Sequence, residues 1–180
     1  MTKTKIKFCG ITSVEDYLFI NDLIDVNFIG MIFTKKSPRY LTIENVNKIL
    51  ESTKRQKIIV GVFMDQSYED INNILKEVDL DIIQFHGDET LEFCESFNKP
   101  FIKTLHINNQ SFVYNSDFKN TANYFLLDTS IDNKYGGTGK KFDWDLLSKN
   151  ITISDLTHNS SYFVAGGLNP SNVAELIIQH

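Results

Sequence analysis

The sequence predicts one α/β domain in which a parallel β-sheet is covered by helices. Seven short segments that favour β-strands alternate along the chain with segments of helical periodicity. The strand segments are continuously apolar, which is typical of parallel strands buried on both faces. With 42% hydrophobic residues, the 180-residue chain can bury one core, so we expect a single domain over residues 1–180.

Two parallel α/β architectures fit this alternation, the doubly wound sheet and the (β/α) barrel. A doubly wound sheet that binds a dinucleotide carries Gly-x-Gly-x-x-Gly directly after its first strand. The first turn of this chain offers only Cys9-Gly10. The sequence therefore favours an α/β fold of the (β/α)8 TIM-barrel class, of minimal size.

The first half of the chain is expected to form four strands and four helices. Ser13 is placed to cap the first helix and Thr42 to cap the second. The expected strands cover residues 6–9, 28–33, 57–63 and 81–85; the expected helices cover 13–24, 42–50 and 67–78, and the fourth ends at residue 97. On the first helix, the apolar side is expected to carry Val14, Tyr17, Leu18, Leu23 and Ile24.

The second half supplies three more strands and less regular connections. Strands are expected over residues 101–105, 124–127 and 162–165, with Asp128 closing the second of these. We expect a short helix within 108–120, a glycine-rich loop through 136–139 and a helix that begins at 143–147. Asn169 as cap and Pro170 in the first turn predict the start of the last helix.

Composition excludes several classes of function. Two cysteines cannot build a disulfide scaffold and suit a reducing compartment, so we expect a cytoplasmic protein. The net charge of −5 and the scattered cations argue against a nucleic-acid partner. No run is long enough to cross a membrane, residues 1–8 lack the apolar stretch of a secretory signal, and the four histidines lack metal-ligand spacing.

Four candidate positions lie at or just after the carboxyl ends of predicted strands, where (β/α) barrels carry their chemistry. They are Cys9, Arg39, Asp128 and the pair Gly166-Gly167. Lys7 shares a strand face with Cys9, and a thiol close to a cation can act as base or nucleophile. The two glycines before a helix can present backbone N–H groups to a phosphate. Each group also has a simpler interpretation: a buried thiol, a solvated cation, a turn-forming aspartate and a flexible turn.

A second glycine cluster, Gly136-Gly137-Thr138-Gly139-Lys140-Lys141, superficially resembles a P-loop. Lys141 stands where a P-loop needs Ser or Thr, and Lys134 stands where it needs its first glycine. We interpret the segment instead as a mobile loop over the site.

Seven short motifs follow one another in a fixed order from one end of the chain to the other. They are Lys7-Phe8-Cys9-Gly10-Ile11, Ser37-Pro38-Arg39, Val60-Gly61-Val62-Phe63, Gln84-Phe85-His86-Gly87-Asp88-Glu89, Leu127-Asp128, Gly136-Gly137-Thr138-Gly139 with Phe142-Asp143-Trp144, and Ala165-Gly166-Gly167-Leu168-Asn169-Pro170. Together they resemble the phosphoribosylanthranilate isomerase family of tryptophan biosynthesis.

The resemblance implies an isomerase of the aldose–ketose type that needs neither a metal nor an organic cofactor. Its reaction would be the Amadori rearrangement of N-(5-phosphoribosyl)anthranilate to 1-(2-carboxyphenylamino)-1-deoxyribulose 5-phosphate. By the same resemblance, Asp128 is the general acid, Cys9 the general base and Arg39 the partner of the anthranilate carboxylate. Gly166 and Gly167 match half of the phosphate site. The implied partner is a small phosphoribosyl substrate, and we expect a monomer, with a dimer as the alternative.

The family's closing segment, an eighth strand followed by a phosphate loop and a last helix, has no counterpart in the 180 residues. We therefore expect seven strands, a gap beside Cys9, weak phosphate binding and poor turnover. The alternative function is a catalytically silent truncated barrel that only binds phosphate or a partner chain.

Overall fold

A computed structural model describes residues 4–107, 116–131, 134–135, 143–149, 153, 155 and 161–179. The chain divides into two compact units, residues 1–101 and residues 102–180. Each unit is described by itself.

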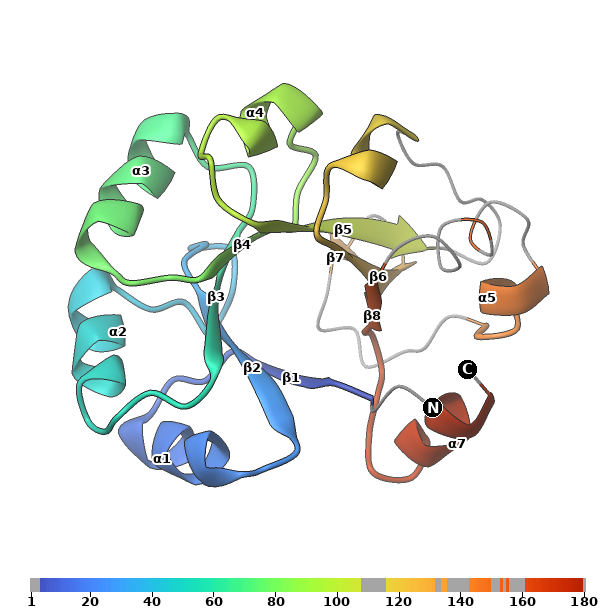
Figure 1. The fold of residues 1–180 in the computed structure, drawn as a ribbon, viewed down its shortest axis with the longest axis horizontal. Helices are drawn as coiled ribbons and strands as arrows, with labels where there is room; N and C mark the ends of the chain where they lie inside the picture. Colours follow the sequence, from blue (N-terminus) through green and yellow to red (C-terminus); the bar gives the residue numbers. More distant parts are fainter. Residues whose placement is uncertain are drawn as a thin grey trace. The chain divides into compact units, whose positions relative to one another are not determined.

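In unit 1, strands and helices alternate, with the helices covering one side of the strands (Figure 1). The elements are β1 (Ile6–Cys9), α1 (Val14–Asp22), β2 (Val26–Ile32), α2 (Ile43–Leu50), β3 (Ile58–Phe63), α3 (Tyr68–Glu77), β4 (Ile82–Phe85) and α4 (Leu91–Glu95). The predicted strands and helices of this half are confirmed, with boundaries that move by a few residues.

The four strands of unit 1 pair in parallel and in chain order. Their register sets Cys9 beside Gly30, Gly30 beside Val60, and Val60 beside Ile82. Paired residues of a parallel sheet share one face, so these four lie on the face turned away from the helices. Gly61 belongs to the opposite face, because a Cβ there would collide with Leu80 and Phe63.

Each helix of unit 1 begins at a hydroxyl cap. The side chains of Ser13, Thr42, Ser67 and Thr90 each accept a hydrogen bond from the backbone N–H three residues on. The two caps predicted from the sequence, Ser13 and Thr42, are confirmed. These bonds satisfy N–H groups that a helix leaves unpaired at its start.

The expected apolar face of the first helix is partly wrong. Tyr17 is buried as predicted, but its buried companions are Ile20 and the polar Asn21. Ile24 is 88% exposed, because α1 stops at Asp22 and Leu23 already has an extended backbone. The predicted helix extended two residues beyond the observed one, so the helical periodicity does not describe residues 23 and 24.

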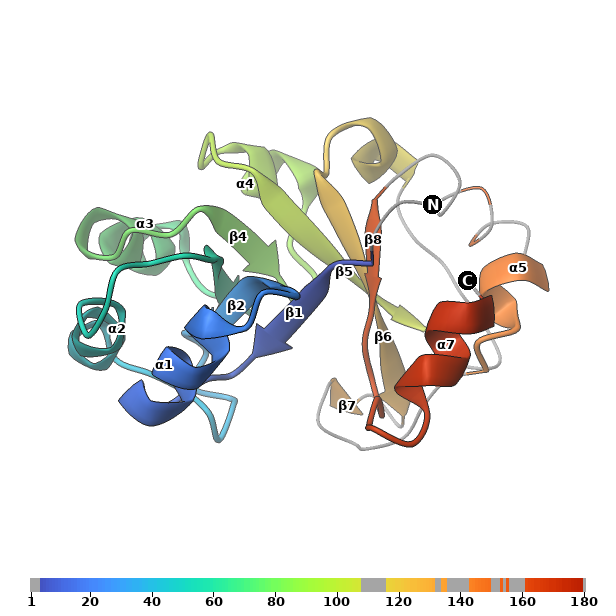
Figure 2. The same cartoon turned by 60° about the horizontal axis from the view of Figure 1, so that its bottom comes forward.

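Unit 2 holds the remaining parallel strands (Figure 2). Its elements are β5 (Phe101–Ile107), the 3-10 helix η1 (Ser116–Asn120), β6 (Tyr124–Ile131), β7 (Lys134–Tyr135), α5 (Leu146–Lys149), β8 (Tyr162–Val164) and α7 (Val173–Gln179). β6 pairs in parallel with both β5 and β8, and the chain reverses direction between β8 and α7.

Two expectations for this half need correction. β6 does not close at Asp128 but continues to Ile131, where it pairs with the short antiparallel β7 inside the region expected to be loop. The last helix begins at Val173 rather than at Pro170, since residues 170–172 form a turn. The glycine-rich segment 136–139 lies outside the described residues, as does the part of the expected short helix before residue 116.

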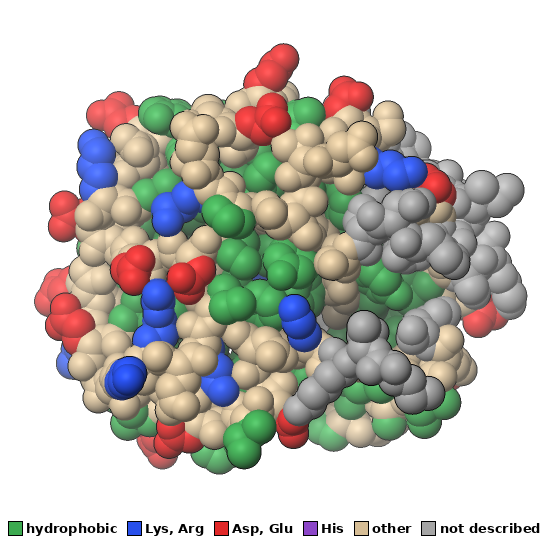
Figure 3. Space-filling model, in the orientation of Figure 1, with side chains coloured by type: hydrophobic (Ala, Val, Ile, Leu, Met, Phe, Trp, Pro, Cys, Tyr) green, Lys and Arg blue, Asp and Glu red, His purple; other side chains and the backbone are tan. Residues whose placement is uncertain are grey.

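The described residues thus contain seven parallel strands with intervening helices, which confirms the α/β class. None of the helices that the structure describes combines the length and the apolar character needed to cross a membrane. Basic and acidic side chains are interspersed among the described residues on the face in Figure 3, without a continuous basic patch. The single-domain prediction and the gap expected beside Cys9 stay predictions.

Candidate active site

Cys9 is the last residue of β1 and carries a free, half-buried thiol. The chain leaves the strand abruptly at Gly10, which has φ +83° and donates its N–H to the carbonyl of Gly30 at 2.8 Å. Glycine adopts this backbone conformation without steric penalty. The turn leaves the thiol at the carboxyl end of the strand, where the sequence placed it.

Arg39 lies against Cys9. Its Nη1 donates to the carbonyl oxygen of Cys9 at 2.8 Å, and a Cβ at Gly10 would sit 2.6 Å from the same nitrogen. Within the part of the chain that the structure describes, the guanidinium makes no other side-chain hydrogen bond or ion pair. Its remaining donors can therefore receive a planar anion such as a carboxylate.

The loop that carries Arg39 is closed by backbone bonds. Leu41 donates to the carbonyl of Ile32 at 2.9 Å, and the Arg39 N–H donates to Ser37 Oγ at 3.1 Å. A cavity of about 630 Å³ adjoins this loop at the carboxyl ends of β2 and β3, lined in part by Tyr40 and Gln66. The loop geometry holds Arg39 over the end of β1.

In unit 2, Asp128 is 6% exposed and lies beside Gly166. Its Oδ1 accepts a hydrogen bond from the Thr129 N–H at 2.8 Å. A Cβ at Gly166 would lie 2.9 Å from that same oxygen and would collide with the Thr129 hydroxyl. With φ +85°, Gly166 meets a conformational and a steric demand at once.

The loop after β8 is held by two asparagines. Asn172 Nδ2 donates to the carbonyl of Gly167 at 3.0 Å, and Asn172 Oδ1 accepts from the Asn169 N–H at 2.9 Å. The Ser171 N–H donates to Asn169 Oδ1 at 2.9 Å. Asn169 thus makes the bond expected of a cap, and the sequence analysis did not single out Asn172, which holds the loop through Gly167.

A hydrogen-bonded cluster at the neighbouring loops was also missed. Asp65, with φ 52°, accepts from the Asp88 N–H at 2.8 Å and from Lys36 Nζ at 2.9 Å. Glu89 Oε1 accepts from the Asp65 N–H at 2.9 Å and from the Gly87 N–H at 3.3 Å. The His-Gly-Asp-Glu motif therefore ties three loops of unit 1 together, which gives it a structural role.

His106 is a further neighbour of Asp128 that the sequence did not single out. The two residues are paired in the register of β5 and β6, so their side chains lie on one face of the sheet. In unit 1, Gln84 Nε2 lies 3.3 Å from His86 Nδ1.

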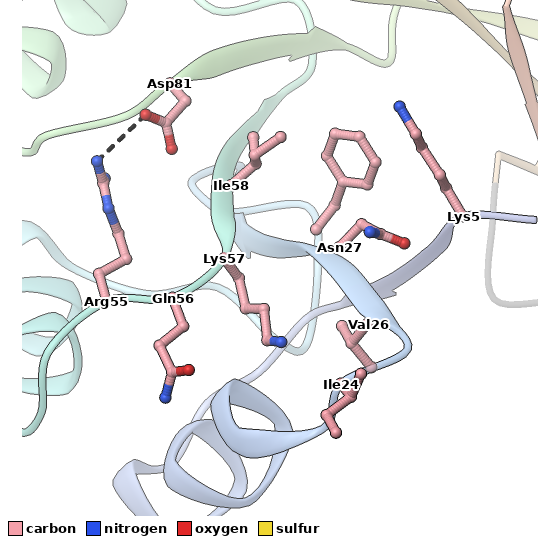
Figure 4. A pocket seen from close by; sticks show the side chains of 10 residues that line it. Lys5, Ile24, Val26, Asn27, Arg55, Gln56, Lys57, Ile58 and Asp81 are labelled. Carbon is pink, nitrogen blue, oxygen red and sulfur yellow. Dashed lines mark hydrogen bonds and ion pairs between the residues drawn. The ribbon is translucent and has the colours of Figure 1, made fainter. Parts of the chain in front are cut away.

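A cavity of about 460 Å³ lies at the amino ends of β2 and β3, away from Cys9 (Figure 4). Arg55 on its wall pairs with Asp81 at 3.2 Å, and Lys57 Nζ donates to the carbonyl of Leu23 at 2.6 Å. Arg55 and Lys57 therefore make contacts that stabilise unit 1.

The structure thus brings the predicted residues together in two groups. Cys9 and Arg39 are in contact in unit 1, and Asp128 and Gly166 are in contact in unit 2, with Gly167 next in the chain. All of them lie at or near the carboxyl ends of parallel strands, which is where barrel enzymes hold their reacting groups.

Comparison with known proteins identifies the family. Residues 6–180 match the family model of N-(5'-phosphoribosyl)anthranilate (PRA) isomerase. The N-(5'-phosphoribosyl)anthranilate isomerase of Legionella pneumophila strain Paris is 38% identical over 180 residues, which cover 98% of this chain and 82% of that protein.

Two solved structures extend the likeness to the fold. The phosphoribosylanthranilate isomerase of Thermotoga maritima has a TM-score of 0.77 at 32% identity, covering 97% of this chain and 82% of that one. A structure of the same kind of enzyme, in complex with reduced 1-(o-carboxyphenylamino)-1-deoxyribulose 5-phosphate, has a TM-score of 0.73 at 29% identity and covers 97% of this chain and 81% of that one.

The fold and these comparisons define an isomerase of the TIM-barrel class. The chain belongs to the N-(5'-phosphoribosyl)anthranilate isomerase family, whose enzymes act in tryptophan biosynthesis. The resemblance stated from the sequence is confirmed.

Proposed function

We propose that this chain catalyses the Amadori rearrangement of N-(5-phosphoribosyl)anthranilate with Asp128 as acid and Cys9 as base. The observation that carries the proposal is the contact between Arg39 and the end of β1. It sets a guanidinium with unused donors next to a free thiol, in a chain of this family.

Ring opening is the first step. The carboxylic acid of Asp128 gives its proton to the furanose ring oxygen, the C1′–O bond breaks, and the anthranilate nitrogen becomes an iminium. The Thr129 N–H bond fixes the orientation of the Asp128 carboxyl group, and the small neighbour Gly166 leaves it room.

Proton transfer from C2′ is the second step. The thiolate of Cys9 takes this proton, and the C–H electron pair neutralises the iminium nitrogen to give an enol. The enol then converts to the ketone. A positioned acid or base of this kind contributes about 10²–10⁴-fold to the rate.

Arg39, Gly166 and Gly167 bind the substrate in this proposal. The free donors of Arg39 suit the anthranilate carboxylate, because a guanidinium forms two parallel hydrogen bonds with a carboxylate. The backbone of Gly166 and Gly167 contributes to phosphate binding. We further propose a cytoplasmic enzyme that works as a monomer on this small molecule, with a dimer as the alternative.

The test is a fluorescence assay for loss of phosphoribosylanthranilate. We expect Cys9→Ala and Asp128→Asn each to lower kcat by about 10²–10⁴-fold without changing the thermal midpoint appreciably. Cys94→Ala is the matched control, because Cys94 is a buried thiol of α4 away from β1.

Two results would contradict the proposal. Activity retained in Cys9→Ala would remove the assigned base. Phosphate binding by the unaltered chain without any turnover would favour the silent barrel instead.

A further inference from the structure

Lys7 shares a strand face with Cys9 and has no part in the proposed reaction so far. Lys7 and Cys9 are half-buried, whereas Ile6 and Phe8, which alternate with them, are exposed. A Cβ at Gly30 would lie 2.8 Å from Cys9 Sγ and 3.2 Å from Lys7 Nζ. The ammonium thus extends along β1 to the level of the thiol, and both occupy the space that Gly30 leaves open.

The surroundings of Lys7 are unusual for a lysine. On this face the strand register sets Phe28 beside Lys7, and Val60 and Ile82 follow Gly30 across the sheet; these three side chains are apolar and buried. The Lys7 side chain forms no hydrogen bond or ion pair with the described residues. Lysines are seldom placed beside buried apolar side chains without a partner, which makes this half-buried ammonium a candidate for a role at the neighbouring thiol.

We propose that Lys7 is a positioning residue for Cys9, with its ammonium acting as counter-ion of the thiolate that accepts the C2′ proton. The inference rests on the proposed role of Cys9 as base. In that step the C2′–H bond breaks, the S–H bond forms, and the electron pair moves toward the iminium nitrogen. Negative sulfur and positive nitrogen are neutralised together, while Lys7 keeps its proton throughout.

Arg39 is a second cation near Cys9, but its hydrogen bond goes to the backbone carbonyl of Cys9. The two cations therefore have different proposed roles. Arg39 keeps free donors for the substrate carboxylate, and Lys7 lies beside the sulfur.

The test compares two alkylating reagents on the full chain at one pH. Iodoacetate is an anion and iodoacetamide is neutral, yet both react with the thiolate, so the thiolate fraction cancels from the ratio of their rate constants. The ratio for Cys9, followed by mass spectrometry of its peptide, reports only the local charge. We expect Lys7→Met to lower it about 5-fold, the effect of losing one nearby unit charge in a wet environment.

Two further variants complete the experiment. Lys7→Arg keeps the charge and should retain the ratio and most of kcat. Lys5→Met is the matched control, since Lys5 precedes the same strand and lines the cavity in Figure 4. It removes the same charge and should leave both quantities within about 2-fold, because an exposed charge more distant from the sulfur is screened.

An unchanged ratio in Lys7→Met, or an equal fall in Lys5→Met, would overturn the inference. So would a normal kcat in Lys7→Met despite a lowered ratio. Activity retained in Cys9→Ala would instead remove the proposed base, and this outcome does not depend on the alkylation ratio.

Discussion

At the scale of single residues, glycines create the space in which the candidate side chains lie. Gly10 and Gly166 adopt positive φ and stand against Arg39 and Asp128. Gly30 has an ordinary strand backbone, so its contribution is only the absence of a side chain next to Cys9 and Lys7. A methyl group at Gly30 needs no unusual φ, and it would press on Cys9 Sγ at 2.8 Å and on the Cys9 Cα at 3.2 Å.

We expect Gly30→Ala to lower kcat/KM at least 10-fold while changing the free energy of unfolding by less than about 1 kcal/mol. The added Cβ would push Sγ and Nζ aside, and small displacements of reacting groups are costly in rate. Gly61→Ala is the control: its Cβ would meet Leu80 and Phe63 in the core, which should cost about 1–3 kcal/mol of stability. Kinetics and urea unfolding of both variants measure this contrast, and equal kinetic losses in the two would contradict it.

Tyr17 predicts a pH dependence of stability. Burial raises the pKa of its phenol, and the nearby charge of Arg55 lowers it only in part. The unfolded chain therefore loses this proton at a lower pH than the folded chain, so the free energy of unfolding should fall as the pH rises above about 10. The phenol also lacks a hydrogen-bond partner among the described residues.

Tyr17→Phe should accordingly be neutral or stabilising at pH 7 and should weaken the alkaline decline, because an unpartnered buried hydroxyl is unfavourable. Urea unfolding of both proteins at pH 7 and pH 10.5 measures this. Tyr162, whose pKa burial also raises, should maintain part of the decline in the variant. A parallel decline in the two proteins would contradict the assignment to Tyr17.

At the scale of elements, Asn21 connects α1 to the segment that enters β3. Its Nδ2 donates to the carbonyl of Lys54 at 3.1 Å, and its Oδ1 accepts from the Gln56 N–H at 3.0 Å. The Asn21 side chain is fully buried, and both of its bonds are partly buried. They fix where β3 begins relative to α1.

Asn21→Ala should lower the free energy of unfolding by about 1–3 kcal/mol, because a fully buried side chain would lose two partly buried hydrogen bonds to the backbone. Asn27→Ala is the comparison variant. Its one bond, from the Ile6 N–H at 3.2 Å, is exposed, and its loss should cost less than about 1 kcal/mol. Chemical denaturation measures both, and similar losses would show that burial does not set the difference.

The elements also show what the sequence can and cannot predict. The apolar strands and the caps Ser13 and Thr42 are local signals, and the structure confirms them. The start of α7 was misplaced because Asn169 does accept from the Ser171 N–H, as a cap does, while residues 170–172 form a turn before the helix begins at Val173. The hydrogen bond between Asp65 and the Asp88 N–H joins residues that are 23 apart in sequence, and no local sequence pattern predicts it.

The candidate site likewise combines features that local sequence patterns predict with contacts that depend on the fold. Strand alternation already placed Lys7 on the same side as Cys9, but their approach over Gly30 depends on the register of β1 with β2. The contact of Arg39 with the Cys9 carbonyl likewise requires the closed loop after β2.

At the scale of the whole molecule, the proposed acid and base come from distant parts of the chain, Cys9 near its start and Asp128 in the second half. They are assigned to successive steps, ring opening by Asp128 and proton removal by Cys9. Arg39 differs from both, because its proposed role is to hold the substrate in every step. These assignments make different predictions for double variants.

We expect Cys9→Ala and Asp128→Asn together to lower kcat/KM no more than about 3-fold beyond the larger single loss. When two successive steps are each slowed, the slower step limits the rate, so the losses do not multiply. Arg39→Ala combined with Asp128→Asn should instead give a loss close to the product of the single losses, since binding and ring opening are independent contributions. The fluorescence assay on the three single and two double variants measures both cycles. A multiplicative loss for the Cys9 and Asp128 pair would mean that both groups act in one step, and the stepwise assignment would be wrong.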